Sequence, residues 1–533
     1  MRRRMYQIGM ILSLCFLVIL GKLAYTQLYS GSVYASRSFQ TQADLFTLED
    51  HHRGDILDRN GKSLLNSCTA PALIIIPQAD SQSEKLHTFL ADYLPAASLT
   101  LLDQKRTSDE PLVIPLSQNE ASALSRAALP YGMVVAPYHW RYQDPLAVHL
   151  IGCLDYSGHG VKGLEKYYDA LLSSSSSAYT LAYLSDAYDH SLPGGEGVRI
   201  IPPDTEKNAL YLTLDHDIQK TLEDCLNRHH IAKGAAIILD VSTNEVLASA
   251  SRPLYDPQDL SQTFGFNDNQ LERSLGAEYR YYPGSTFKIA TAIAALESHC
   301  PALAESFSCT NEAPYAKCPR THAEVDLKRG LKVSCNNYFI HLGESMGRET
   351  LERYLLDTLH FSLEPGKSFD SFSAIANGVI GQELFRVSPW QMAQLITIIA
   401  NDGYGWQTDA PWQEQLTASI EINGQRQPVQ IDRQFVPIIS AETAHILQED
   451  LAAAIDSPDG THLTYAGKTG TPEITAEDGS QSYLAWYVGY APAESPKYAV
   501  AVVIEDILGV PKTDLSGGKY ALPFFQDLIQ QLP

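Results

Sequence analysis

The chain has little positive charge and few cysteines. It carries 39 Lys and Arg against 62 Asp and Glu, a formal net charge of −23, and so acidic a surface repels phosphate backbones. Nucleic acid is therefore not an expected partner. Eight cysteines in 533 residues are too few for a disulfide scaffold. With 44% hydrophobic and 19% charged residues, the composition is that of a globular protein and not of a disordered one.

Two common catalytic signatures are also missing. None of the 16 histidines precedes a glutamate, so the H-E-x-x-H motif of zinc peptidases is absent. Gly-Lys-Ser/Thr occurs at 61–63, 366–368 and 467–469, but no glycine stands five positions earlier in any of them. The sequence therefore contains no phosphate-binding P-loop.

The N-terminus has the pattern of a membrane anchor. Arg2, Arg3 and Arg4 precede an uncharged, largely apolar run from Met5 to Gly21, which is a little shorter than the ~20 residues that cross a bilayer. Lys22 can snorkel to the headgroups and lengthen the span. We expect residues 1–28 to be a cytoplasmic tip and an uncleaved single-pass anchor, with the rest of the chain outside the cell membrane. A cleavable signal peptide is the alternative.

The remainder divides into two regions by texture. Residues 29–205 include an expected strand at 73–76. From 110 to 205 short apolar runs alternate with turn signals, and the serine run 173–177 is an expected exposed loop. From 206 to 533, strands at both ends enclose a mainly helical stretch from 285 to about 400. This order predicts an α/β domain of the α+β type, with helices flanking a mainly antiparallel sheet. The strands are expected at 234–240, 245–250, 466–472, 484–491 and 498–505.

A serine and a lysine are spaced for nucleophilic catalysis. Residues 283–288 read Pro-Gly-Ser-Thr-Phe-Lys and open an apolar helix, so Ser285 stands where unpaired amides stabilise developing negative charge. Lys288 is three residues on, on the same face of the helix. A serine hydroxyl needs a base, which a lysine of depressed pKa can supply. Alone, the S-x-x-K pattern equally fits an ordinary N-cap serine and a solvated lysine.

A second motif, Ser334-Cys335-Asn336, follows 49 residues after Ser285. Its hydroxyl and carboxamide could relay a proton and orient a substrate amide. By itself the motif is also compatible with a polar turn.

A third motif, Lys468-Thr469-Gly470-Thr471, begins 134 residues after Ser334. We expect it on a strand, where glycine lets a substrate approach the backbone as an added strand. Lys468 and the hydroxyls can bind a carboxylate, and a second cation near Lys288 would lower the pKa of that lysine. The order S-x-x-K, S-x-N, K-T-G at these distances is highly specific.

At this point the chain resembles the penicillin-recognising serine acyltransferases. Further stretches resemble the class B penicillin-binding proteins, which are monofunctional peptidoglycan transpeptidases, and imply that 29–205 is their pedestal, or dimerisation-like, domain. These stretches are 53–61, 160–167, 381–393 and 486–490. On this resemblance, 206–533 is the penicillin-binding transpeptidase domain.

The resemblance implies roles for the motif residues in a D,D-transpeptidase. Ser285 would attack the D-Ala-D-Ala bond of a peptidoglycan stem peptide, with Lys288 as the base. Ser334 would pass a proton to the leaving D-alanine, and Asn336 and Lys468 would hold the network and the substrate.

Substrate binding would extend along the third motif through Thr469, Gly470 and Thr471, and the amides of Ser285 and Thr471 would form the oxyanion hole. The implied partners are stem peptides, nascent glycan strands, β-lactams that acylate Ser285, and a membrane glycan polymerase. No cofactor is implied.

Alternatives remain open both for the function and for the state of the cysteines. A β-lactam sensor or a non-catalytic scaffold for a polymerase would share the three motifs, as would a β-lactamase, although no E-x-x-L-N follows Ser334. Cys309 and Cys318 could form a disulfide or remain free. A zinc site using Cys309, Cys318 and His322 is a further alternative, but a fourth ligand and the C-x2-C spacing are missing, so a metal is not the expectation.

Overall fold

The computed structural model describes most of the chain. The described residues are 2–26, 44–47, 53–76, 86–96, 98–100, 112–127, 129, 133–155, 158–173, 180–183, 198–201, 208–257, 279–310, 318, 320–456, 462–475 and 479–533. Most of the serine run at 173–177 lies outside them.

Contacts divide the chain into two compact units that do not follow it linearly. Unit 1 consists of 1–52, 68–141 and 176–205, and unit 2 consists of 53–67, 142–175 and 206–533. Two segments of the expected pedestal domain thus pack with the expected catalytic domain.

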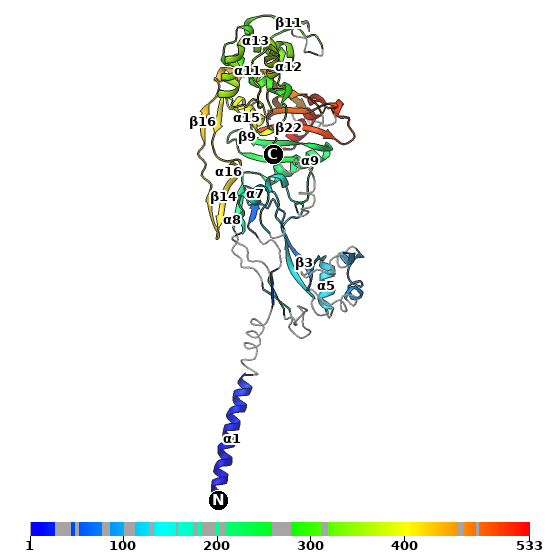
Figure 1. Cartoon of the computed structure of the whole chain (residues 1–533), viewed down its shortest axis with the longest axis vertical. Coiled ribbons are helices and arrows are strands. Elements are labelled where there is room, and N and C mark those ends of the chain that lie inside the picture. The colour runs from blue at the N-terminus through cyan, green and yellow to red at the C-terminus, as the bar shows by residue number, and fades with distance from the viewer. Residues whose placement is uncertain are drawn as a thin grey trace. The chain divides into compact units, whose positions relative to one another are not determined.

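A six-stranded antiparallel sheet forms the centre of unit 2 (Figure 1). The apolar run at 234–240 and the run after it form the expected hairpin, in which Ala250 faces Ala236 across the ladder. The remaining expected strands are also present, and the sixth strand, at 452–456, was not expected. In spatial order the strands are β10 (Val246–Arg252), β9 (Ile231–Asp240), β22 (Tyr498–Ile507), β21 (Ala485–Ala491), β18 (His462–Gly470) and β17 (Ala452–Asp456).

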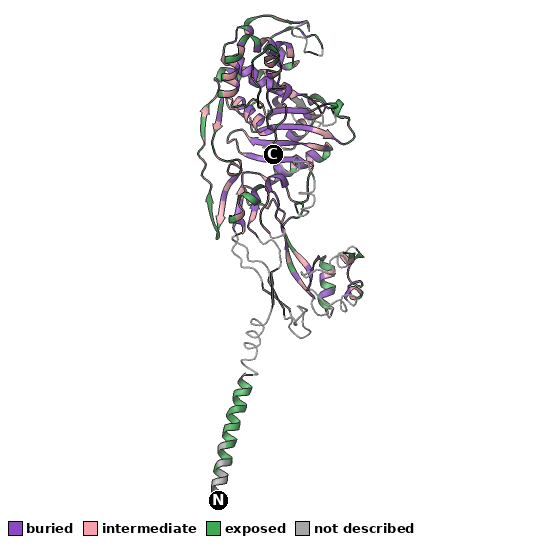
Figure 2. Ribbon diagram, in the orientation of Figure 1, coloured by how far each residue is buried: buried purple, intermediate pink, exposed green. Residues whose placement is uncertain are grey.

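Helices cover both faces of this sheet, because alternate side chains of each strand point to opposite faces. In β9, Ile237 packs in one apolar cluster with α11 (Lys288–Glu297) and α15 (Pro389–Ala400). Its neighbour Ile238 packs in a second cluster. That cluster is completed by α9 (His216–Arg228) and α18 (Leu522–Gln531). Figure 2 shows the buried strands between these layers. The mixed fold with an antiparallel sheet flanked by helices is as predicted.

Smaller elements complete unit 2. A four-stranded sheet has the order β15 (Gln425–Pro428), β14 (Thr417–Ile422), β8 (Ala209–Leu212) and β2 (Asp55–Leu57). Two-stranded sheets pair β11 (Phe307–Cys309) with β12 (Ala323–Val325), β13 (Tyr404–Gln407) with β16 (Gln434–Pro437), and β19 (Glu473–Thr475) with β20 (Gln481–Tyr483). The other helices are α6 (Val148–Ile151), α7 (Gly163–Tyr167), α8 (Asp169–Ser173), α12 (Leu327–Lys332), α13 (Asn336–Leu351), α14 (Phe372–Gly378), α16 (Trp412–Gln415) and α17 (Ala441–Leu451).

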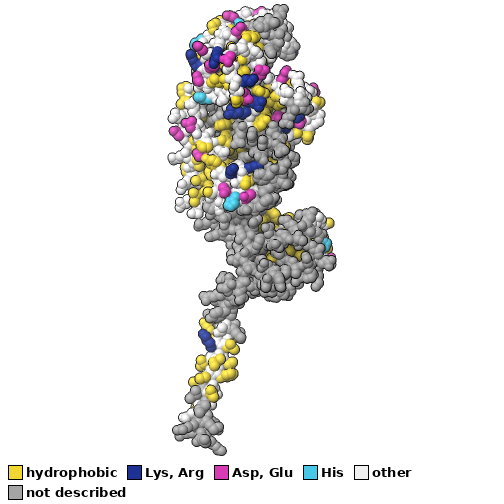
Figure 3. Space-filling model, in the orientation of Figure 1, with side chains coloured by type: hydrophobic (Ala, Val, Ile, Leu, Met, Phe, Trp, Pro, Cys, Tyr) yellow, Lys and Arg dark blue, Asp and Glu magenta, His cyan; other side chains and the backbone are white. Residues whose placement is uncertain are grey.

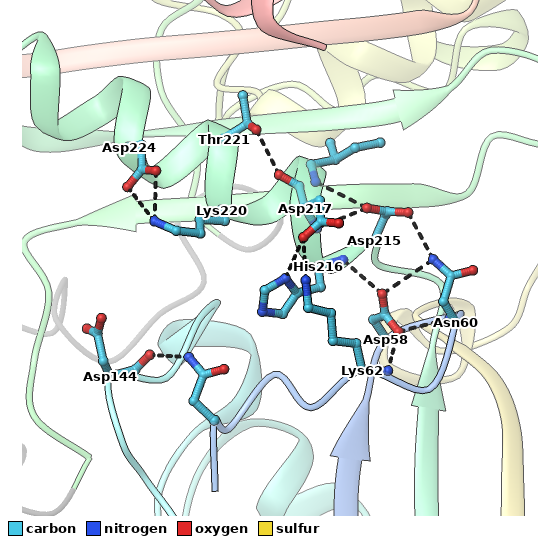
Figure 4. Close-up of polar contacts among 12 residues, drawn as sticks. Asp58, Asn60, Lys62, Asp144, Asp215, His216, Asp217, Lys220, Thr221 and Asp224 are labelled. Carbon is cyan, nitrogen blue, oxygen red and sulfur yellow. Dashed lines mark hydrogen bonds and ion pairs between the residues drawn. The ribbon is translucent and has the colours of Figure 1, made fainter. Parts of the chain in front are cut away.

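The turn after β2 is fastened to the start of α9. Asp58 is buried and its carboxylate accepts hydrogen bonds from the backbone amides of Asn60, Lys62 and His216, at 2.9, 2.7 and 3.0 Å. Asp215 is the N-cap of α9 and also accepts from the Asn60 side chain at 3.2 Å. Figure 4 shows these groups converging from the two segments. Because the carboxylates satisfy amides that would otherwise be unpaired, the turn at 58–62 is held firmly.

A buried ion pair joins two of the segments that the sequence singled out. The guanidinium of Arg53 lies 3.2 Å from the Glu165 carboxylate, and their side chains are 3% and 0% exposed. Arg53 also donates to the Gly158 carbonyl at 2.7 Å, and the Tyr142 hydroxyl donates to Glu165 at 2.9 Å. A charge pair this deeply buried is tolerated because additional hydrogen bonds satisfy both groups.

The described part of unit 1 contains two three-stranded sheets together with helices. The expected strand at 73–76 is confirmed as part of β3 (Cys68–Ile75), which lies between β4 (Leu112–Pro115) and β5 (Met133–Trp140). The second sheet has the order β1 (Asp44–Thr47), β6 (Thr180–Tyr183) and β7 (Val198–Ile201). A capping box at Ser117 and Glu120 starts α5 (Gln118–Arg126).

The N-terminal residues form a single helix, α1 (Arg2–Ala24). Its described apolar side chains, among them Leu14, Phe16 and Ile19, are exposed, as Figures 2 and 3 show. Among the described residues, no helix meets the combined length and hydropathy of a membrane span.

Candidate active site

A tight turn presents the predicted nucleophile. Gly284 has a φ of +53° and begins a short 3-10 turn, Gly284–Phe287, that runs directly into α11. Ser285 is only partly buried, whereas the residues on either side of it are fully packed. A side chain at Gly284 would meet Pro472 at 2.8 Å. The sequence expectation of a serine at a helix start is therefore confirmed.

Lys288 is fully buried and brings two of the three motifs together. Its Nζ lies 3.1 Å from Ser285 Oγ and 3.1 Å from Ser334 Oγ. It also donates to the Ser334 carbonyl at 2.8 Å and to Asn336 Oδ1 at 2.6 Å. The face of the Phe339 ring lies 5.6 Å from the same nitrogen. Residues 49 apart in the sequence thus meet at one amine.

The second motif has an unusual backbone. Ser334 links α12 to α13 with a φ of +54°, a left-handed conformation that is strained for a residue with a side chain. Ser334 and Asn336 are partly exposed, and the intervening Cys335 is fully buried. The kink therefore turns the two polar side chains toward Lys288 and the thiol into the protein.

The third motif lies beside the nucleophile turn. Lys468, Thr469 and Gly470 end β18, in register with Val488 to Trp486 of β21. A side chain at Gly470 would meet the Pro283 carbonyl at 2.8 Å, so glycine permits the close approach of β18 to the turn that carries Ser285. Thr471 follows the strand, and its hydroxyl accepts from the Gly517 amide at 3.0 Å.

The two lysines have unusually low pKa values. Burial holds the pKa of Lys288 well below its usual value, and the nearby positive charge of Lys468 lowers it further. Burial lowers the pKa of Lys468 to about 8. A desolvated amine next to a second cation is easily deprotonated, as a general base must be.

The stretch that follows the second motif supports the nucleophile turn. The Gly284 amide donates to the Gly381 carbonyl at 2.9 Å. Gly381 has a φ of +75°, and a side chain there would meet the Gly284 carbonyl at 2.3 Å. The sequence pointed to this stretch only through the resemblance and gave no structural task to Gly381.

A second serine motif in the sequence does not form a nucleophile site. Residues 343–347 read Gly-Glu-Ser-Met-Gly, the G-x-S-x-G string that marks a strand-to-helix nucleophile elbow in other hydrolases. Here the string lies inside α13, and Ser345 is exposed to solvent. It therefore lacks the required structural context.

Three cysteines and one histidine gather behind the second motif. Cys309 and Cys318 form no disulfide with each other. Cys318 Sγ instead lies 3.7 Å from Cys335 Sγ, and Cys309 Sγ lies 3.6 Å from His322 Nδ1. Cys335 belongs to this group although it stands at the variable position of S-x-N, where nothing in the sequence marks it as a ligand.

The fold and this arrangement match a known family. Residues 234–530 match the protein family described as "Penicillin binding protein transpeptidase domain", and they contain all three motifs. The chain belongs to the penicillin-binding protein transpeptidase family. The resemblance read from the motifs is thereby confirmed.

Relatives of this transpeptidase cover most of its length. Stage V sporulation protein D of Bacillus subtilis is 26% identical, over 99% of this chain and 85% of the relative. Peptidoglycan D,D-transpeptidase PbpA of Mycolicibacterium smegmatis is 27% identical, over 72% of this chain and 82% of its own. The solved structure of penicillin binding protein 3 from Mycobacterium tuberculosis, complexed with aztreonam, shares the fold with a TM-score of 0.57 and 21% identity, over 91% of this chain and 96% of that one.

Proposed function

We propose that this chain is a peptidoglycan D,D-transpeptidase that cross-links stem peptides through an acyl-enzyme on Ser285. The observation that carries the proposal is the position of Lys288 Nζ, within 3.1 Å of Ser285 Oγ and in contact with Ser334 and Asn336. The naming of relatives as D,D-transpeptidases supports the same reaction.

The contacts of Lys288 indicate how the base works. The Ser334 carbonyl and Asn336 Oδ1 can only accept hydrogen bonds, and they make the two shortest contacts, 2.8 and 2.6 Å. A neutral amine has two N–H groups for these acceptors and one lone pair left over. The lone pair is then left for one of the two nearby hydroxyls, that of Ser285 or that of Ser334, and either of them can donate. Lys288 can therefore remove the Ser285 proton as the serine attacks.

The remaining steps use the other motif residues. The Ser285 acyl bond forms as the peptide bond breaks, and Ser334 passes the proton from Lys288 to the leaving D-alanine amine. Backbone amides of Ser285 and Thr471 hold the oxyanion. An amine from a second stem peptide then attacks the acyl-enzyme, forms the cross-link and regenerates the Ser285 hydroxyl.

The third motif is suited to hold the substrate chain. β17 pairs with β18 only along His462–Ala466, so Lys468–Gly470 extend beyond the end of that neighbour. A stem peptide can add beside these residues as a strand. Its terminal carboxylate would be bound by the Lys468 ammonium and the hydroxyls of Thr469 and Thr471. A β-lactam of similar shape would acylate Ser285 in the same position.

We also propose that residues 1–28 anchor the protein in the cell membrane, with the N-terminus cytoplasmic and the catalytic domain outside. The support is the basic start and the uncharged run from Met5 to Gly21. Such an anchor places the enzyme beside a membrane glycan polymerase, its proposed partner. If the full chain and a variant lacking residues 1–28 both remained in the supernatant after cell lysis and sedimentation, this proposal would be wrong.

Fluorescent penicillin tests the nucleophile. The solubilised protein should take up one label per chain, and Ser285→Ala should take up none. Ser345→Ala is the matched control, since this exposed serine of the same domain should leave labelling unchanged. Persistent labelling of Ser285→Ala would overturn the assignment.

Cross-linking of donor and acceptor stem peptides by the purified protein separates the enzyme from its alternatives. A chain that took up the label but never formed cross-links would be a sensor or scaffold. Release of the bound drug within seconds would identify a β-lactamase.

A further inference from the structure

Four potential metal ligands lie together behind the S-x-N motif. The donor atoms of Cys309, Cys318, His322 and Cys335 are all within 4.8 Å of one another, and all four residues are buried. None of them is a hydrogen-bond partner of Lys288, whose partners are Ser285, Ser334 and Asn336.

Two of the distances between these atoms fit a tetrahedral metal site. Zn–S bonds of ~2.3 Å and Zn–N bonds of ~2.0–2.1 Å at tetrahedral angles place two sulfurs about 3.8 Å apart, and sulfur and nitrogen about 3.5–3.6 Å apart. The structure has 3.7 Å between the sulfurs of Cys318 and Cys335. Cys309 Sγ and His322 Nδ1 are 3.6 Å apart. A disulfide would bring the two sulfurs to about 2.05 Å, so the geometry fits a shared ion and not a covalent bond.

Neighbouring groups support thiolates at this place. The Asn337 side chain donates to Cys309 Sγ at 3.4 Å, and its backbone amide donates to Cys318 Sγ at 3.5 Å. Asn337 is itself fully buried. Donors of this kind surround metal-bound thiolates, whose charge they stabilise. Cysteines that only filled apolar space would not need them.

We propose that Cys309, Cys318, His322 and Cys335 bind one zinc ion. Three sulfurs and one imidazole nitrogen fill a four-coordinate structural site and leave no position open for a substrate. Each thiol that is protonated beforehand loses its proton to solvent on binding. Cys335 is the fourth ligand, which the spacing of Cys309, Cys318 and His322 in the sequence does not reveal.

The zinc site has a positioning role in catalysis, and this part rests on the proposed function. Cys335 lies between Ser334, which has the strained φ of +54°, and Asn336. A metal bond to Cys335 ties this kink to Cys309 on β11 and His322 beside β12. The ion thereby holds the acceptors that keep Lys288 in place, although it touches no reacting atom.

The metal content of the purified full chain tests the site. Protein prepared under reducing conditions without chelator should contain one zinc per chain by mass spectrometry. Replacement by Co²⁺ should give the intense visible absorption of a tetrahedral thiolate site. Cys309→Ser and His322→Gln should lose most of the metal. Cys300→Ser, a change at a buried free cysteine outside the group, should keep it.

The acylation rate tests the positioning role. Removal of zinc by a strong chelator should lower the rate of penicillin labelling at least tenfold, and added Zn²⁺ should restore it. His322→Gln should not respond to either treatment. An unchanged rate in zinc-free wild-type protein would overturn the positioning role.

Other results would overturn the site itself. These are wild-type protein that does not retain zinc, zinc retained equally by Cys309→Ser, or a Cys318–Cys335 disulfide in the isolated protein. Ser285→Ala should still bind one zinc. If the wild-type protein took up penicillin but contained no zinc, the metal site would be wrong and the proposed function would stand. If it contained zinc but took up no penicillin, the proposed function would be wrong and the metal site would stand.

Discussion

At the residue scale, the chemistry depends most on Lys288, a fully buried lysine with four polar contacts. Lys288→Met keeps a chain of similar length but removes the amine. Because a positioned general base contributes typically 10²–10⁴-fold, we predict that the rate of penicillin acylation falls by about that factor. Stopped-flow or gel-based labelling measures it.

The control for this prediction is Lys328→Met, since Lys328 lies on the surface with a 63% exposed side chain. Its acylation rate should equal that of the wild type. A Lys288→Met protein that folds and acylates at the normal rate would show that another group removes the Ser285 proton.

The two lysines also predict how acylation depends on pH. Lys288 acts as a base only when neutral, so the rate should rise with pH through its pKa, which burial and Lys468 hold well below the usual lysine value. Lys468 binds a carboxylate only when charged, and its pKa is about 8. The second-order rate constant, which reports the free enzyme, should therefore fall again as the pH rises through about 8.

Lys468→Arg separates the two limbs of this profile. A guanidinium stays charged throughout the accessible range, so the descending limb should disappear, whatever the new maximum rate. The ascending limb should remain, with its midpoint set by Lys288. If the fall near pH 8 persisted in Lys468→Arg, it would belong to another group.

At the scale of elements, two glycines with the same backbone conformation separate strain from contact. Gly381 and Gly366 both have a φ of +75°. A side chain at Gly381 would meet the Gly284 carbonyl at 2.3 Å, whereas one at Gly366 would meet nothing within 4 Å. Gly366→Ala should lose about 1 kcal/mol of stability to backbone strain and acylate normally. Gly381→Ala should lose more stability and most of its acylation rate, because the turn carrying Ser285 must move.

Thermal unfolding and penicillin labelling of the two variants provide the comparison. Equal labelling by both would mean that the support of Gly284 by Gly381 does not control the nucleophile.

Much of this arrangement of elements could be predicted from local sequence. The apolar runs at 234–240, 484–491 and 498–505 became strands of the central sheet, and the helix after Ser285 lies where it was expected. These features depend on neighbours within a few residues, such as strand runs and the i, i+3 spacing of a helix. Even the contact of Ser285 with Lys288 follows from that spacing.

The remaining features depend on contacts between distant residues. Cys335 meets Cys309, Cys318 and His322 because a kink at Ser334 directs it inward, and no local pattern indicates the direction of a kink. Likewise, β9 pairs with β22, more than 250 residues later in the chain. Sequence periodicity predicts that a strand exists but not which strand lies beside it.

At the scale of the whole molecule, unit 2 draws on three separate stretches of the chain. The segments 53–67 and 142–175 contribute Ile56, Leu64 and Leu150 to the same buried cluster as Leu210 and the helices around the active site. The domain boundary expected between residues 205 and 206 stays a prediction. The apolar packing indicates that these segments and 206–533 unfold together.

The Arg53–Glu165 ion pair provides the test of that cooperativity. Glu165→Gln leaves the Arg53 guanidinium, which is 3% exposed, with only one of its two carboxylate partners, Asp169 at 2.8 Å. The change should therefore cost less than the ~3–5 kcal/mol of a fully broken buried pair, but more than about 1 kcal/mol. Lys220→Gln, which breaks the exposed pair with Asp224, should cost less than about 1 kcal/mol. If unit 2 unfolds cooperatively, Glu165→Gln should lose penicillin labelling and the β-sheet signal in circular dichroism in a single thermal transition. That transition should lie at a lower temperature than in the wild type. Limited proteolysis reports when the segments 53–67 and 142–175 unfold. If penicillin labelling survived their unfolding, residues 206–533 would hold the site by themselves.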